Sequence, residues 1–183
     1  MILGVIPCKT TSNRLPRKNF HKIGNDTLLD LAIQYLGTSE KIGRIQVYTD
    51  NLEFEGIPDH QKRHPGVEFH KDPPHGGYLC DLFKAVFDTW FRKSDLKAMV
   101  CVSPDNPIRP DDLDGILDDF LESKRHEHVT YSKGYKVGAL HILSREALEK
   151  GYISGYQSYS MIDGIDIHTS KDLMEARKCL IQD

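Results

Sequence analysis

Paired cysteines, long apolar runs and net charge are all scarce in this chain of 183 residues. The four cysteines, at positions 8, 80, 101 and 179, form no C-x-x-C pair, so we expect no disulfide framework and a reducing, cytoplasmic setting. The longest apolar runs are too short to cross a bilayer, and the first residues lack the basic segment of a signal peptide. The net charge of −3 argues against a nucleic-acid or membrane-surface partner.

The small net charge conceals a basic segment near the start of the chain. Residues 8–22 carry five Lys or Arg and no acid, which leaves 19 basic against 27 acidic side chains elsewhere. Because basic side chains and loop N–H groups together neutralise phosphates, this segment is a candidate polyanion site. On charge alone, a solvated surface loop accounts for the pattern equally well.

The apolar pattern alternates between short strands and amphipathic helices, which predicts a single domain with a doubly wound, mostly parallel α/β sheet. Candidate N-caps are Thr27 with Asp30, Ser144, and Thr169 with Asp172. In such sheets ligands bind at the carboxyl ends of the strands. We expect strands at 2–6, 44–49, 67–70, 98–102, 128–131 and 137–143, and helices at 28–36, 79–90 with a core-facing stripe ending at Trp90, 113–121, after 144 and after 169.

Residues 6–19, Ile-Pro-Cys-Lys-Thr-Thr-Ser-Asn-Arg-Leu-Pro-Arg-Lys-Asn, resemble the nucleotide-binding loop of the sugar-acid cytidylyltransferases. These are the enzymes that make CMP-sialic acid and CMP-3-deoxy-manno-octulosonate. Three further blocks resemble the family's motifs in the same order: residues 47–50, residues 103–109 and residues 164–173. The resemblance therefore spans essentially the whole chain.

This resemblance implies a Rossmann-like fold of the nucleotide-diphospho-sugar transferase type. It also implies an enzyme that transfers CMP from CTP to a small acidic, hydroxylated acceptor and releases pyrophosphate. In-line transfer of this kind needs positioning and charge stabilisation more than covalent chemistry. Lys9, Arg14 and Lys18 are therefore the expected catalytic residues, because they can neutralise the phosphates. The nucleotide-binding set implied by the resemblance is Pro7, Cys8, Lys9, Ser12, Arg14, Lys18, Asn19 and Lys71.

The resemblance also implies a divalent metal, normally Mg²⁺, held by Asp105 and Asp166. His168 stands where the family has a second aspartate. Imidazole is a poor ligand for Mg²⁺ and a better one for Mn²⁺, so Mn²⁺ is an alternative metal here. Arg109 and His168 are weaker candidates for contacts with the acceptor.

The segment between residues 109 and 138 is shorter than in the family, since only 28 residues separate Arg109 from Gly138. We interpret residues 1–183 as one cytidylyltransferase-like domain that lacks most of the usual sugar-pocket and dimerisation arm. The expected assembly is a monomer, or a homodimer without the exchanged arm.

Two other functions remain open from the sequence. The substitution at His168 and the short middle segment are compatible with a degenerate homologue that binds nucleotide without turnover. Asp166-Ile167-His168 is also a variant of the D-x-D metal motif of GT-A-type glycosyltransferases. A zinc hydrolase is disfavoured because no H-E-x-x-H frame occurs. The histidines at positions 60, 64, 70, 75, 126 and 128 are expected at the surface, and His141 is expected in solvent or at the edge of the core.

Overall fold

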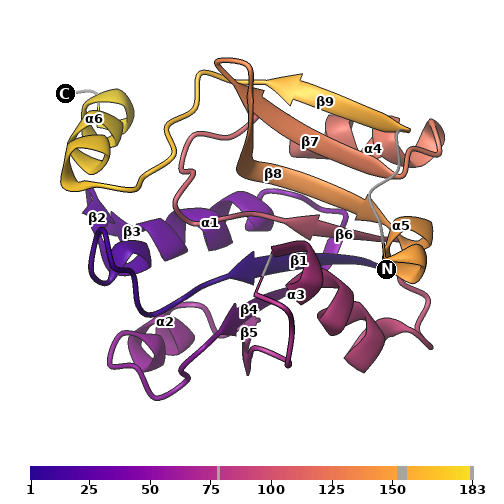
Figure 1. Ribbon diagram of the computed structural model, residues 1–183, viewed down its shortest axis with the longest axis horizontal. Helices are drawn as coiled ribbons and strands as arrows, with labels where there is room; N and C mark the ends of the chain where they lie inside the picture. The colour runs from indigo at the N-terminus through magenta and orange to yellow at the C-terminus, as the bar shows by residue number, and fades with distance from the viewer. Residues whose placement is uncertain (78, 152–155, 182–183) are drawn as a thin grey trace.

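A seven-stranded sheet of order β5-β4-β1-β6-β8-β7-β9 runs through the centre of the molecule (Figure 1). The computed structural model describes residues 1–77, 79–151 and 156–181. Of the seven strands only β8 runs antiparallel to its neighbours, so the mostly parallel α/β fold is confirmed. The strands are β1 (Ile2–Pro7), β4 (Ile42–Thr49), β5 (Val67–Lys71), β6 (Ala98–Cys101), β7 (Glu127–Ser132), β8 (Tyr135–Ser144) and β9 (Gln157–Met161).

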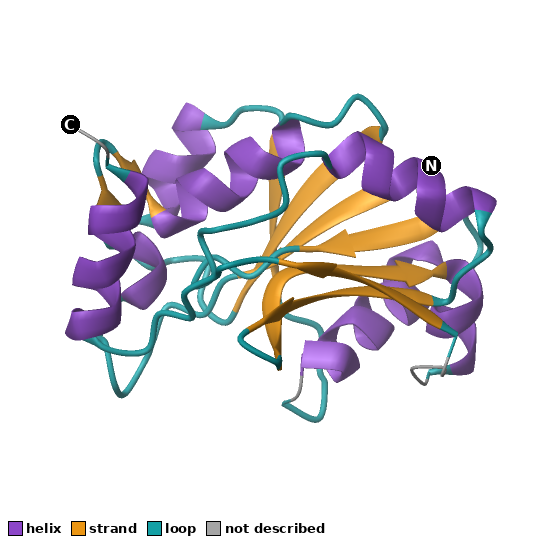
Figure 2. Ribbon diagram, turned by 90° about the horizontal axis from the view of Figure 1, so that it is seen from above, coloured by secondary structure: helices purple, strands orange, loops and turns teal. Residues whose placement is uncertain are grey.

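Helices cover both faces of the sheet, as Figure 2 shows. On one face α1 (Leu28–Gly37) and α4 (Leu113–Glu122) pack their apolar stripes against β1 and β6. On the other face lie α3 (Leu79–Val86), a turn of π-helix η2 (Phe87–Phe91) and α5 (Arg145–Lys150). A third apolar cluster joins the final helix, α6 (Ser170–Leu180), to the hairpin of β2 (Lys22–Ile23) and β3 (Asp26–Thr27).

The N-terminal caps that the sequence predicts are present. Thr27 with Asp30 and Thr169 with Asp172 form complete capping boxes, in which each side chain bonds the other residue's backbone N–H. Ser144 accepts a hydrogen bond from the backbone N–H of Ala147 at the start of α5. No helix in the described part of the chain has the length and apolar character needed to span a membrane.

The prediction that Trp90 belongs to a core-facing stripe is wrong. The helix changes to a π-turn at Phe87, and the wider turn puts Phe87 and Phe91 in the core instead. Trp90 is 47% exposed and lies against Tyr48 and His70. Periodicity of 3.6 residues cannot anticipate this change of helical pitch.

The expectation of surface positions is also wrong for His60 and His128, and His141, expected in solvent or at the edge of the core, is buried as well. His60, His128 and His141 are 2%, 5% and 6% exposed. His60 comes from α2 (Ile57–Arg63), a helix that the sequence does not predict because proline and histidine interrupt its apolar pattern. Each of these buried rings hydrogen-bonds a polar partner, which lowers the cost of removing it from water.

Candidate nucleotide-binding site

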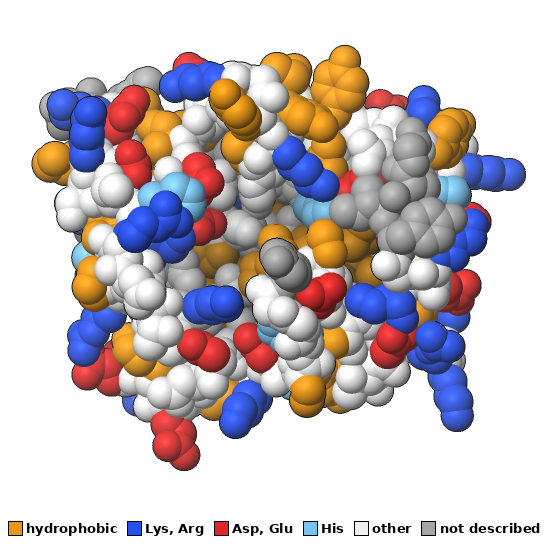
Figure 3. Space-filling model, viewed as in Figure 1, with side chains coloured by type: hydrophobic (Ala, Val, Ile, Leu, Met, Phe, Trp, Pro, Cys, Tyr) orange, Lys and Arg blue, Asp and Glu red, His pale blue; other side chains and the backbone are white. Residues whose placement is uncertain are grey.

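A cavity of about 350 Å³ opens at the carboxyl ends of β1 and β6. The space-filling view is hollowed near its centre, and basic, acidic and histidine side chains lie together beside the hollow (Figure 3). Two loops, after β1 and after β6, supply nearly all of its wall, as expected for an open α/β sheet. The lining residues are Pro7, Lys9, Thr11, Ser12, Lys18, Asn19, Leu79, Ser103, Pro104 and Asp105.

The basic loop after β1 is held in place from three directions. The carboxylate of Asp50, which follows β4, accepts hydrogen bonds from the backbone N–H of Thr10 at 2.8 Å and from its hydroxyl at 2.9 Å. The amide of Asn19 donates to the Lys9 carbonyl at 2.9 Å, and the Ser12 hydroxyl accepts from the Leu15 N–H at 3.4 Å. The loop therefore presents its basic side chains from a fixed backbone.

The expected phosphate-binding side chains differ in what they contact. Lys9 is exposed and makes no ion pair with any described residue, so its charge is available to a ligand. Lys18 is paired with the carboxylate of Asp105 across the cavity. The Arg14 guanidinium donates to Nδ1 of His168 at 3.1 Å. Lys9 and Lys18 thus line the cavity, and Lys18 and Arg14 contact Asp105 and His168, which are discussed next.

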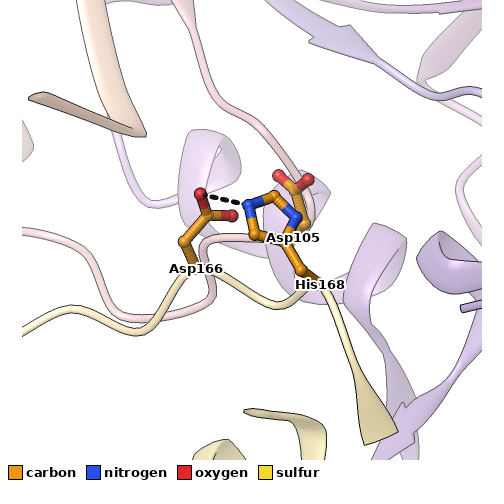
Figure 4. A group of neighbouring side chains, drawn as sticks. All are labelled: Asp105, Asp166 and His168. Atoms are coloured by element: carbon orange, nitrogen blue, oxygen red, sulfur yellow. Dashed lines mark ion pairs between the residues drawn. The ribbon is translucent and has the colours of Figure 1, made fainter. Parts of the chain in front are cut away.

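Asp105, Asp166 and His168 come together from two distant parts of the chain (Figure 4). Asp105 follows β6, whereas Asp166 and His168 precede α6, and one ligand atom from each lies within 4.8 Å of the others. The Asn106 amide donates to Asp105 at 3.2 Å and to Asp166 at 3.4 Å, so it bridges the two carboxylates. Two hard carboxylates facing one point are a donor set suited to Mg²⁺ or Mn²⁺.

His168 already uses both ring nitrogens for protein contacts. Arg14 can only donate, so Nδ1 of His168 accepts and the ring proton is placed on Nε2. That Nε2 faces the Asp166 carboxylate at 2.9 Å. In this arrangement His168 links the basic loop after β1 to Asp166, and neither nitrogen offers a free lone pair to a metal.

The paired carboxylates repel one another in the absence of another cation. Burial, followed by the charge of Asp105, raises the pKa of Asp166 above its ordinary value. Lys18 supplies a compensating charge from the other side of Asp105. A divalent cation at this point would relieve the same repulsion.

Six of the expected site residues do not line the cavity. Arg14, His168 and Asp166 contact one another in that order next to Asp105, whereas Cys8, Lys71 and Arg109 lie apart from this group. The Cys8 thiol is buried and accepts a hydrogen bond from the Asn19 amide, and burial raises its pKa to about 12, so it is neutral. Lys71 is exposed at the end of β5. Arg109 donates to the carbonyls of Ser103 and Pro107 from below their loop, and burial lowers its pKa to about 10. The acceptor contact expected of Arg109 gains no support from this position.

The sequence does not assign roles to several residues that build the site. Asp50 belongs to a recognised block, but its anchoring of Thr10 requires two segments 40 residues apart to meet. Asn106 lies beside Asp105 in another recognised block and bridges the acids. Gly138 in β8 lets the loop after β6 approach, because a Cβ there would lie 2.8 Å from Oγ of Ser103. Only the block resemblance signals the first two residues.

Comparison with known proteins identifies the fold and the family of this chain. A family model described as cytidylyltransferase matches residues 3–141. The fold is similar to a CMP:2-keto-3-deoxy-manno-octonic acid synthetase complexed with CTP, with a TM-score of 0.75, 13% identity and 98% of each chain covered. It is also similar to a cytidylyltransferase from Leptospira borgpetersenii, with a TM-score of 0.72, 17% identity, and 98% of this chain and 86% of that chain covered.

A further similar structure is the 4-diphosphocytidyl-2C-methyl-D-erythritol synthase of Anaerococcus prevotii, with a TM-score of 0.71, 12% identity, and 98% of this chain and 97% of that chain covered. No curated protein sequence matches the chain. At these identities the structural likeness establishes the fold, and the family model, which spans most of the chain, establishes the family. This chain belongs to the cytidylyltransferase family.

Proposed function

We propose that this protein transfers the CMP group of CTP to a small acidic, hydroxylated acceptor. The acceptor oxygen forms a bond to the α-phosphorus, the bond from that phosphorus to the bridging oxygen breaks, pyrophosphate leaves, and the hydroxyl proton passes to solvent. The observation that carries the proposal is the single cleft in which a fixed basic loop faces a pair of carboxylates. The CTP named in the similar synthetase structure supports the choice of nucleotide.

The three cations have distinct proposed roles. Lys9, which makes no ion pair with any described residue, binds the outer phosphates, and Arg14 neutralises charge beside it from a guanidinium oriented by His168. Lys18 reaches from Asp105 toward the leaving pyrophosphate. Charge-assisted hydrogen bonds of this kind stabilise the negative charge that accumulates as pyrophosphate departs.

We propose that Asp105 and Asp166 hold Mg²⁺, with Mn²⁺ as the alternative metal. When bound, the ion would polarise the α-phosphate and offset the triphosphate charge. Mg²⁺ commonly takes one or two carboxylates, with phosphates and water completing its shell, so the two aspartates suffice without imidazole. His168 then fixes the positions of Arg14 and Asp166 relative to one another through its two ring nitrogens. The four free cysteines support a cytoplasmic setting for this chemistry.

Pyrophosphate release tests the proposal. The protein is assayed with CTP and Mg²⁺ against a panel of sugar acids and other hydroxylated acids, and we expect release with at least one of them. CTP binding without release from any acceptor supports the degenerate homologue, which the substitution at His168 motivates. Stronger binding of a nucleotide sugar than of CTP supports a glycosyltransferase. Either result contradicts the proposal.

A further inference from the structure

The two edge strands of the sheet, β5 and β9, are protected very differently. An edge strand exposes unpaired N–H and C=O groups, and proteins usually protect such edges with charge, proline or a covering segment. β5 carries Glu68, His70 and Lys71, and its Glu68 is held by Arg44 in a two-bond pair at 2.7 and 2.8 Å. β9 reads Gln-Ser-Tyr-Ser-Met and contains neither charge nor proline.

β9 also exposes large apolar side chains. Among the described strands it pairs only with β7. Two of its five side chains are large, apolar and exposed, Tyr159 at 67% and Met161 at 63%. Figure 3 shows hydrophobic side chains gathered along the corresponding upper edge of the molecule, where Figure 1 places β9 and the β7–β8 hairpin.

The opposite face of the same edge is open as well. Helix α4 stops short of β9 and leaves a groove of about 580 Å³, with Ser158, Ser160 and His128 on its sheet side. His128 hydrogen-bonds both serine hydroxyls, at 2.9 and 3.1 Å, so the inner side chains of β9 are fixed. The strand is therefore an ordered template for pairing.

We propose that β9 pairs antiparallel with β9 of a second copy of this chain and joins the two sheets into one. Closed two-fold pairing places Tyr159 opposite Tyr159, Ser158 opposite Ser160, and Gln157 opposite Met161. An uncharged strand suits a second copy because two acidic molecules meet there without repulsion between like charges. The proposal rests on the sheet edge alone and is independent of the nucleotide chemistry.

The area available predicts a reversible dimer. Tyr159 and Met161 contribute roughly 300 Å² per copy from their exposed side chains, against about 800 Å² per partner in a standard stable interface. Association is therefore expected to depend on protein concentration.

Sedimentation velocity over a wide range of concentration tests the pairing. We expect the wild type to shift from monomer to dimer, and Met161→Lys to weaken association at least about tenfold, because a lysine on an edge strand blocks strand pairing. The matched control is Met174→Lys, which replaces a methionine of similar exposure, 55%, on α6 and should leave association unchanged. A wild type that stays monomeric, or a Met161→Lys variant that associates as strongly as the control, overturns the proposal.

Disulfide trapping tests the register. Opposed Cα atoms in antiparallel strands lie about 4.5–5.5 Å apart, within the range of a disulfide. We expect Tyr159→Cys to form a reducible covalent dimer under mild oxidation, whereas the wild type, with its exposed Cys80 and Cys179, does not. A dimer that sediments normally but cannot be trapped at position 159 contradicts pairing through β9.

Discussion

Replacing Lys18 with methionine should destabilise the protein in the absence of a divalent metal. The Lys18 and Asp105 side chains are only 15% and 22% exposed. The substitution removes the cation that is paired with Asp105, whose carboxylate also lies beside that of Asp166. Breaking a fully buried pair costs about 3–5 kcal/mol and breaking an exposed one about 0–1 kcal/mol. A pair at this intermediate depth should cost about 2 kcal/mol, which corresponds to a fall in Tm of roughly 4–8 °C for a chain of this size.

Differential scanning calorimetry with a chelator present measures this loss. The control is Lys41→Met, which removes a lysine paired with Asp118 at 3.0 Å where the two side chains are 33% and 57% exposed. It should lower Tm by no more than about 3 °C.

Adding Mg²⁺ should then raise the Tm of Lys18→Met more than that of the wild type, because the metal replaces the missing charge. Equal melting of the two lysine variants, or equal Mg²⁺ shifts in the variant and the wild type, would refute the proposed link between Lys18 and the carboxylate pair.

Three further predictions concern the loop, the core and the strand beside the site. Asp50→Asn removes the charge from the bonds to Thr10 and should weaken CTP binding about tenfold by titration calorimetry; an unchanged Kd contradicts the anchoring role. Burial would raise the pKa of Asp30, but hydrogen bonds from His64 and Thr27 hold it at about 2 against an ordinary 3.8. Its ionised form therefore stabilises the fold by roughly 2 kcal/mol above pH 4, and this is lost as the pH falls toward 2. In urea titrations Asp30→Asn should lack that component of acid sensitivity, and an identical pH profile would count against it. Gly138→Ala crowds Ser103 and should cost about 1–3 kcal/mol with reduced turnover, whereas Gly37→Ala, where a Cβ meets nothing within 4 Å, should cost almost nothing in the same unfolding assay.

Local signals predicted much of the fold. The helix starts at Thr27, Ser144 and Thr169 depend on side chains within three residues of each cap, so the sequence contains the whole interaction. Apolar periodicity predicted the strands β1, β4, β5, β6, β7 and β8 and the helices α1, α3, α4, α5 and α6, but not α2, the short strands β2 and β3, or β9. The π-turn before Trp90 could not be predicted, because the choice between helical pitches depends on packing against distant residues.

The candidate site was predictable in composition but not in its contacts. The family motifs, found in the expected order along the chain, predicted that Lys18, Asp105 and Asp166 belong to one site. In the structure the three side chains lie together. The link from Arg14 through His168 to Asp166 joins residues more than 150 positions apart, so only the fold reveals it. Only the fold likewise shows that Arg109, predicted from the sequence to contact the acceptor, instead donates hydrogen bonds to backbone carbonyls of the loop after β6.

Titration calorimetry with each of the four nucleoside triphosphates in the presence of Mg²⁺ tests the proposed nucleotide chemistry most directly. We predict one binding site that prefers CTP, and a marked loss of affinity in Lys18→Met but not in Lys41→Met. Absence of binding by every triphosphate, or CTP affinity that is unchanged in Lys18→Met, would contradict the assignment of this cleft to CTP.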